Sequence, residues 1–217
     1  FEMKNIVILI SGRGSNMEAL IAARDAGNLP VNIAAVISNR PEAEGLETAA
    51  KASIVTHFVN HKAFAGREAF DAALAECIDE FSPDLVVLAG FMRILSDGFV
   101  RHYEGRLINI HPSLLPSFPG LHTHRRALEE GVRIHGCTVH FVTPTLDHGP
   151  VVIQAAVPVL DDDTEASLAA RVLRHEHRIY PQAVRWFAED KLRLENGRVR
   201  LAADLADSAV LISPEVR

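Results

Sequence analysis

The 217-residue sequence contains few cysteines, no long apolar run and no excess of basic charge. Cys77 and Cys137 are its only cysteines, too few for a disulfide framework, and a chain of this length can bury a sizeable core without one. No apolar run approaches the roughly 20 residues of a membrane span, and the N-terminus lacks the charged and apolar regions of a signal peptide. We therefore expect a cytoplasmic protein with no membrane partner.

The charge balance is acidic, with 28 Asp and Glu against 22 Lys and Arg and a formal charge of -6. This leaves no surplus of basic residues to neutralise a polyphosphate backbone, so no nucleic-acid partner is expected. An anionic small-molecule substrate has to be held by a local device, such as free backbone N–H groups at a helix start. A monomer and a homodimer both remain open.

The hydrophobic pattern predicts an α/β fold. In the first half, short β-branched segments alternate with amphipathic ones, which is typical of a parallel sheet. The expected strands are 5–10, 32–38, 54–59 and 85–89, and the expected helices are 15–27, 44–52 and 62–81. We therefore predict a Rossmann-like open twisted sheet with helices on both faces.

The second half loses the alternating rhythm after a strand at 107–110. Three prolines and a glycine follow within the nine residues 112–120 and predict a stiff loop. Beyond the loop, helices are expected at 122–130 and 164–190, and strands at 136–142 and 151–159. A hairpin of 192–195 and 198–201 is expected around Asn196-Gly197, a dipeptide that favours two successive positive φ angles. The C-terminal half is therefore predicted to be mixed.

A glycine-containing loop joins the first strand to the first helix, with the sequence Ser-Gly-Arg-Gly-Ser-Asn at 11–16. Glycines let the backbone approach a ligand, and N–H groups at the helix start favour a phosphate. A dinucleotide fingerprint would have a third glycine where Met17 stands and an acidic residue near 38–40, where the sequence is Ser-Asn-Arg. The pattern thus disfavours NAD. A plain turn with Ser15 capping the helix remains an alternative.

Asn109 and His111 alternate with apolar residues along one expected strand, so their side chains share one face of the sheet. Pro112 restricts His111 to an extended backbone, which directs the imidazole beyond the carboxyl end of the sheet, where open α/β folds bind ligands. An amide N–H and an imidazolium together can stabilise the oxyanion of an acyl transfer. A histidine satisfied by loop carbonyls is the alternative.

Asp147 lies in a turn between two expected strands. If folding brings it near His111, it favours the charged imidazole and can accept or relay a proton from an attacking amine. An ordinary turn explains the same composition.

Two histidine pairs, His122 with His124 and His175 with His177, invite a metal interpretation. On a helix, however, residues two apart point about 200° away from one another, so neither pair converges on one ion. No metal is predicted.

Five segments are similar to sequence motifs of one enzyme family; they are residues 10–16, 88–95, 109–116, 140–142 and 146–150. On these segments, the chain resembles the phosphoribosylglycinamide formyltransferase family from about residue 5 to 187. The resemblance implies transfer of the formyl group of 10-formyltetrahydrofolate, a co-substrate, to the amine of 5-phosphoribosylglycinamide in purine biosynthesis, without a metal.

The resemblance also implies the site residues. The catalytic residues would be Asn109, His111 and Asp147. The acceptor would be bound by Gly12, Arg13, Gly14, Ser15, Asn16 and Glu176. The folate would be bound by Arg67, Phe91, Met92, Arg93, Ile94, Leu95, Val100, Leu107 and Val142.

The expected organisation is a single formyltransferase domain over 1–217, with a phosphate-binding half at about 1–103, a folate and catalytic half at about 104–190, and a hairpin and tail at 191–217. Formyltetrahydrofolate deformylases and methionyl-tRNA formyltransferases are similar in the catalytic segments, but each carries an additional domain for which this chain is expected to have no room. A formyl-donor hydrolase and a non-catalytic nucleotide-binding module remain the alternatives.

Overall fold

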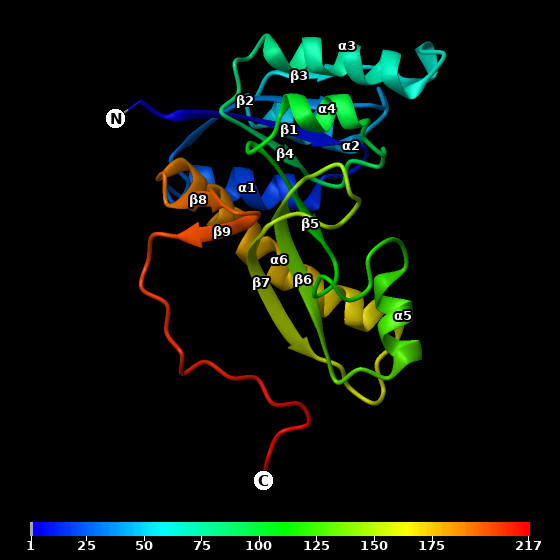
Figure 1. Cartoon of the computed structure of the whole chain (residues 1–217). Helices are drawn as coiled ribbons and strands as arrows, with labels where there is room; N and C mark the ends of the chain where they lie inside the picture. Colours follow the sequence, from blue (N-terminus) through cyan, green and yellow to red (C-terminus); the bar gives the residue numbers. More distant parts are fainter. Residues whose placement is uncertain (1) are drawn as a thin grey trace. The chain divides into compact units, whose positions relative to one another are not determined.

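The computed structural model describes residues 2–217 as an alternation of strands and helices (Figure 1). The strands are β1 (Lys4–Ile10), β2 (Val31–Ser38), β3 (Thr56–Phe58), β4 (Leu85–Leu88), β5 (Leu107–His111), β6 (Ile134–Phe141), β7 (Val151–Pro158), β8 (Leu192–Glu195) and β9 (Arg198–Leu201). The helices are α1 (Ser15–Asp25), α2 (Glu44–Lys51), a 3-10 turn (His61–Ala63), α3 (Arg67–Asp79), α4 (Asp97–His102), α5 (Thr123–Glu130) and α6 (Glu165–Ala188).

Seven strands form one sheet in the order β3-β2-β1-β4-β5-β6-β7. The pairs from β3 to β5 are parallel, whereas β6 and β7 are antiparallel. The predicted mixed α/β fold with a parallel N-terminal half is confirmed. The chain divides into two compact units, residues 1–109 with 141–144 and residues 110–140 with 145–217. None of the helices formed by residues 2–217 is long and apolar enough to cross a membrane.

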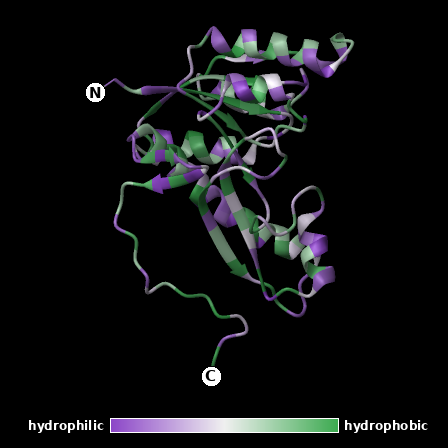
Figure 2. Ribbon diagram, in the orientation of Figure 1, coloured by the Kyte–Doolittle hydropathy of each residue, from purple (hydrophilic) through white to green (hydrophobic). Residues whose placement is uncertain are grey.

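The first unit is built on β1, whose residues from Ile6 to Ile10 have no solvent exposure. The strands of this unit are largely hydrophobic in Figure 2, because strands buried on both faces need continuous apolar runs, such as β4 and residues 6–10 of β1. The register places Ile8 beside Val36 of β2 and Val87 of β4. The buried strands end together at residues 10, 38 and 88, and this carboxyl edge supports the loops of the candidate site.

Two helices of this unit differ from the predictions. The helix expected at 62–81 begins only at Arg67, because a 3-10 turn at 61–63 precedes it and Gly66 has an extended backbone. The short helix α4 was not predicted at all. It begins where the Ser96 hydroxyl accepts a hydrogen bond from the Phe99 backbone N–H at 3.3 Å, and six residues are too few to show a helical period.

The second unit contains the β6–β7 pair and the long helix α6, which packs against β7. Thr164 and Ser167 form a reciprocal capping box at the start of α6. The predicted hairpin is confirmed, since β8 and β9 are antiparallel and Asn196 and Gly197 have φ angles of 53° and 73°. After β9, residues 202–217 contain no helix or strand (Figure 1).

Candidate active site

The 11–16 loop of the first unit leaves room for a ligand at the start of α1. Gly14 precedes the helix with a φ of 70°, a conformation that glycine adopts without strain. A Cβ placed on Gly12 would meet nothing within 4 Å, so the loop is open there. The loop is also held from behind, because the Gly45 backbone N–H donates to the Gly12 carbonyl oxygen at 3.0 Å. Backbone N–H groups in the first turn of a helix, such as those at the start of α1, suit an anion.

A buried pair of polar side chains connects this loop to the segment after β4. The Ser11 hydroxyl donates to the Asn39 side-chain oxygen at 2.5 Å and accepts from the Met92 backbone N–H at 2.7 Å. Ser11 and Asn39 are almost fully buried. The expected phosphate loop and the expected folate segment are therefore fixed to one another within the first unit.

The residues expected to bind folate fall into two groups. Phe91, Leu95 and Val142 pack against the cluster that contains Val100 and Leu107. By contrast, Met92 and Ile94 are 68% and 62% exposed, and they offer apolar surface to a ligand. The Val142 N–H donates to the Leu107 carbonyl oxygen at 2.8 Å, which fixes 141–144 beside β5.

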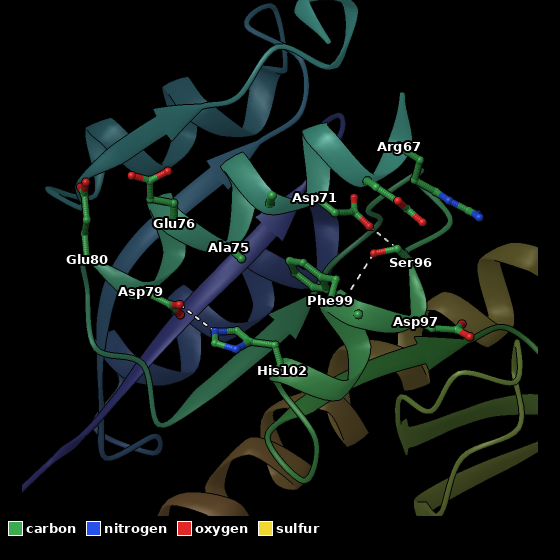
Figure 3. A pocket seen from close by; sticks show the side chains of 13 residues that line it. Arg67, Asp71, Ala75, Glu76, Asp79, Glu80, Ser96, Asp97, Phe99 and His102 are labelled. Carbon is green, nitrogen blue, oxygen red and sulfur yellow. Dashed lines mark hydrogen bonds and ion pairs between the residues drawn. The ribbon is translucent and has the colours of Figure 1, made fainter. Parts of the chain in front are cut away.

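Two arginines expected to bind folate lie in different environments. Arg93 stacks over the Phe70 ring, 5.0 Å from guanidinium carbon to ring centre, and its buried Nε has no hydrogen-bond partner among residues 2–217. Arg67 is exposed at the start of α3 and lines a cavity of about 1040 Å³ between α3 and α4 (Figure 3). Six carboxylates share this cavity, those of Glu68, Asp71, Glu76, Asp79, Glu80 and Asp97. The cavity is acidic apart from the Arg67 end and His102.

His111 and Asp147 lie close together in the second unit, although 35 positions separate them in the sequence. His111 Nδ1 is 3.5 Å from Asp147 Oδ1, and the two side chains are 8% and 10% exposed. This distance is longer than a good N–H···O hydrogen bond but within the range of an ion pair. Asp147 therefore lies beside Nδ1 without forming a short hydrogen bond to it.

Both members of the pair are fixed by the loop after β5. His111 Nε2 lies 2.9 Å from the Phe118 carbonyl oxygen, and the Gly120 backbone N–H donates to Asp147 Oδ2 at 2.8 Å. Because a carbonyl oxygen only accepts, the hydrogen of the neutral imidazole resides on Nε2. In that tautomer Nδ1, the nitrogen beside Asp147, carries the lone pair.

Asn109 and Glu176 are placed by regular elements. Asn109 is half-buried on β5, two residues before His111. Glu176 is buried on α6, and together with the dominant effect of burial its charge raises the pKa of Cys137 to about 12. Cys137 is consequently a neutral thiol at physiological pH and unsuited to nucleophilic work.

A second pair of histidines lies near His111. His124 Nδ1 and His135 Nε2 are 3.0 Å apart, and His135 is 1% exposed. Burial lowers the pKa of His135 to about 4, with the charges of His124 and His111 contributing in the same direction. The pKa of His124 is also lowered, first by burial. Among residues 2–217 no group of three or more His, Cys, Asp or Glu side chains is arranged to hold a metal ion.

Comparison with known proteins decides the family. The model of the formyl transferase family matches residues 4–184, more than half of the chain. The chain belongs to the formyl transferase family.

Individual relatives of this family narrow the comparison. The chain is 55% identical over 190 residues to the phosphoribosylglycinamide formyltransferase of Escherichia coli, covering 88% of this chain and 90% of that protein. The crystal structure of glycinamide ribonucleotide transformylase 1 from Symbiobacterium toebii matches with a TM-score of 0.89 and 49% identity, covering 92% of this chain and 94% of that one. The formyltetrahydrofolate deformylase of Burkholderia mallei matches with a TM-score of 0.85 but only 27% identity, covering 93% and 71%.

In this formyl transferase, the sequence motifs did not reveal the residues that support the loops. Gly45 is a single glycine at a helix start, and nothing in its surroundings marks its contact with Gly12. In the sequence, Asn39 is distinguished only by standing where a dinucleotide-binding fold would have an acidic residue. Phe118 and Gly120 lie in the proline-containing loop, where the composition predicts stiffness and not which carbonyl or N–H faces His111 or Asp147.

Proposed function

We propose that this member of the formyl transferase family transfers the formyl group of 10-formyltetrahydrofolate to the amine of 5-phosphoribosylglycinamide. The observation that carries the proposal is the pair of the His111 imidazole and the Asp147 carboxylate, which lie 3.5 Å apart. Each of the two side chains is held by a hydrogen bond to the backbone of the loop after β5. The relatives named phosphoribosylglycinamide formyltransferase, one of them 55% identical, support the choice of acceptor. Because the family match spans parts of both compact units, we propose that the chain works as a single formyltransferase domain.

The acceptor is proposed to bind through its phosphate to the loop formed by Gly12, Arg13, Gly14, Ser15 and Asn16. The open space at Gly12 and the N–H groups at the start of α1 support this assignment, since they suit an anion in a protein of net negative charge. Glu176 is proposed to accept hydrogen bonds from the ribose hydroxyls. Glu176 is buried on α6, and a carboxylate has two oxygens that can accept hydrogen bonds from hydroxyl groups.

The donor is proposed to lie along the segment 91–95. Exposed Met92 and Ile94 offer apolar surface, and the Arg93 guanidinium offers a cation to the folate carboxylates. Phe91, Leu95, Val100, Leu107 and Val142 are proposed to surround the pteridine, and their clustering supports this. Arg67 is proposed to meet the glutamate tail, because its guanidinium is an exposed cation suited to carboxylates.

The chemistry is proposed to be direct acyl transfer. The acceptor amine attacks the formyl carbon, a C–N bond forms, and the carbonyl oxygen becomes an oxyanion that the Asn109 amide and protonated His111 stabilise. Collapse of this tetrahedral intermediate breaks the bond to the folate nitrogen. Asp147 orders a water that carries the proton lost by the amine to that leaving nitrogen. No covalent enzyme intermediate is required.

Release of tetrahydrofolate tests this function and its nearest alternative. Purified protein is incubated with 10-formyltetrahydrofolate, with and without 5-phosphoribosylglycinamide. A transferase releases tetrahydrofolate only with the acceptor, whereas a deformylase releases it equally without. Release without acceptor at the same rate would make the protein a hydrolase, and no release in either case would leave only ligand binding.

Substitution of the proposed catalytic residues tests the site. Asn109→Ala, His111→Ala and Asp147→Ala are each expected to lower turnover by on the order of 100-fold or more. Circular dichroism and thermal melting establish that each variant is folded. Near-normal turnover in all three folded variants would contradict the assignment.

A further inference from the structure

The segment Phe118–Leu121, called here the contact loop, holds both proposed proton-handling groups. Its Phe118 carbonyl oxygen accepts from His111 Nε2 at 2.9 Å, and its Gly120 N–H donates to Asp147 Oδ2 at 2.8 Å. The His111–Asp147 distance of 3.5 Å is therefore fixed by where two backbone groups, two residues apart, are located.

The backbone of the contact loop does not adopt this conformation by preference. Phe118 has a φ of 51°, and His122, the first residue after the contact loop, has a φ of 55°. Both angles lie in the left-handed region, which costs a non-glycine residue about 1 kcal/mol or more. Gly120, with a φ of 82°, adopts its conformation without that cost. Such angles at bulky residues persist only where other contacts hold the backbone. The loop therefore needs a clamp.

Arg126 on α5 provides these contacts. Its Nη1 donates to the Pro119 carbonyl oxygen at 2.6 Å and to the Leu121 carbonyl oxygen at 3.0 Å. The two carbonyls flank Gly120, whose N–H binds Asp147. The guanidinium carbon also lies 5.6 Å from the centre of the Phe118 ring, within range of a cation–π interaction. One side chain thus grips the contact loop at three points.

The helix that carries Arg126 is itself anchored to the strand end. The Thr123 hydroxyl, at the first residue of α5, donates to the Pro112 carbonyl oxygen at 2.6 Å. Pro112 directly follows His111. The helix that carries Arg126 is therefore attached to the same backbone that carries the His111 imidazole.

We propose that Arg126 is a positioning residue for formyl transfer, which sets the tautomer of His111 and the place of Asp147 by clamping the contact loop. The proposal rests on the assignment of His111 and Asp147 made above. Arg126 touches neither reacting atom and acts through the Phe118 carbonyl and the Gly120 N–H.

The chain offers a matched control in Arg125, an exposed arginine on the same helix. Arg126→Met keeps the aliphatic stem and removes every donor, and Arg126→Lys keeps the charge but removes the planar guanidinium. Arg125→Met and Arg125→Lys make the same chemical changes outside the clamp. Wild-type transfer activity, measured first, separates failure of the proposed function from failure of the clamp.

We expect Arg126→Met to lower kcat about 10- to 100-fold, as displacement of a catalytic group by around 1 Å does elsewhere. The KM for the acceptor should stay within about twofold, because the phosphate loop does not depend on the clamp. Arg126→Lys should retain more turnover than Arg126→Met but less than Arg125→Lys. A kcat for the Arg126 variants equal to that of their Arg125 counterparts would overturn the proposal, as would a loss confined to KM.

Nitrogen-15 spectra of the histidine rings give a readout independent of turnover. In the wild type, the neutral His111 ring should show the hydrogen fixed on Nε2. In either Arg126 variant, the two ring nitrogens should shift toward the values of a mixed tautomer, while the Arg125 variants retain the wild-type spectrum. An unchanged His111 spectrum in a folded Arg126 variant would also overturn the proposal, and if Arg126→Met does not fold, Arg126→Lys decides it by the same two measurements.

Discussion

Gly45→Ala is expected to move the loop that we propose as the phosphate site. Gly45 is the second residue of α2, and a Cβ added there would contact Ile10 Cδ1 and stand 2.9 Å from the carbonyl oxygens of Gly12 and Arg13. Ordinary contact begins at 3.4 Å, so the loop has to retreat by about 0.5 Å, the difference between 3.4 and 2.9 Å. Ile10 is fully buried and cannot yield freely.

Two consequences of different kinds follow from this displacement. Overpacking a buried site typically costs about 1–3 kcal/mol, so the free energy of unfolding should fall by that amount. The N–H groups that meet the phosphate move with the loop, so the acceptor KM should rise about tenfold, equivalent to about 1.4 kcal/mol of binding. Because the change alters the proposed phosphate site and none of the proposed catalytic residues, kcat should fall much less than acceptor affinity.

Denaturant unfolding and steady-state kinetics measure the two effects. Gly98→Ala is the matched control, since Gly98 is also the second residue of its helix and a Cβ there meets nothing within 4 Å. It should leave the acceptor KM unchanged and stabilise the protein slightly, because alanine loses less conformational entropy than glycine on folding. If Gly45→Ala behaved like Gly98→Ala in both measurements, the steric reasoning about the loop would be refuted.

Three further predictions concern buried polar groups. Ser11→Ala removes the hydroxyl that donates a hydrogen bond to Asn39 and accepts one from the Met92 N–H. The free energy of unfolding in denaturant titration should fall by about 1–3 kcal/mol, and the KM for 10-formyltetrahydrofolate should rise. An unchanged KM for 10-formyltetrahydrofolate would contradict the proposed link to the folate segment. Burial lowers the pKa of His135 from 6.5 to about 4, so the free energy of unfolding is highest above pH 6.5 and falls by about 2 kcal/mol at pH 5. In His135→Asn, the denaturant midpoint of unfolding should vary less between pH 7 and pH 5 than in the wild type. A wild-type midpoint that does not change over this range would show that the imidazole can be protonated in the folded protein. Hydrogen bonds of 2.6 and 2.8 Å from Arg171 hold the pKa of the partly buried Asp163 carboxyl well below its usual range. Asp163→Asn should therefore destabilise the protein by about 1 kcal/mol at pH 7 in thermal melting. The difference from wild type should shrink at acid pH, where the carboxylate is lost anyway.

The parts of the fold that the sequence predicts are those set by local pattern. Continuous β-branched runs identify β1 and β4 because strands covered on both faces need apolar side chains in both directions. Asn196-Gly197 identifies a hairpin because few other dipeptides accept two positive φ angles. The phosphate-type loop is found for a related reason, since Gly14 stands where the chain requires a left-handed residue.

Features that depend on distant residues escape the sequence. A phenylalanine in the sequence does not indicate a φ of 51°, because this angle depends on distant residues. Arg126 contacts the Phe118 ring, and His111 Nε2 contacts the Phe118 carbonyl oxygen. The approach of Asp147 to His111 was a hypothesis about proximity, since the 35 intervening positions leave their separation undetermined; the structure brings the two side chains to 3.5 Å. The family resemblance implies roles for His111 and Asp147 but not the contacts that position them.

The fixed tautomer of His111 constrains the proposed mechanism. Because Nε2 donates to the Phe118 carbonyl, the nitrogen that can stabilise an oxyanion is Nδ1, and this is also the nitrogen beside Asp147. In a Ser-His-Asp triad the carboxylate binds the ring nitrogen away from the reaction, and its role is orientation. Here the Phe118 carbonyl of the contact loop orients the imidazole through Nε2, and Asp147 lies beside Nδ1, the nitrogen proposed to face the oxyanion. In the proposed mechanism, a carboxylate in that position can bind the water that takes the amine's proton.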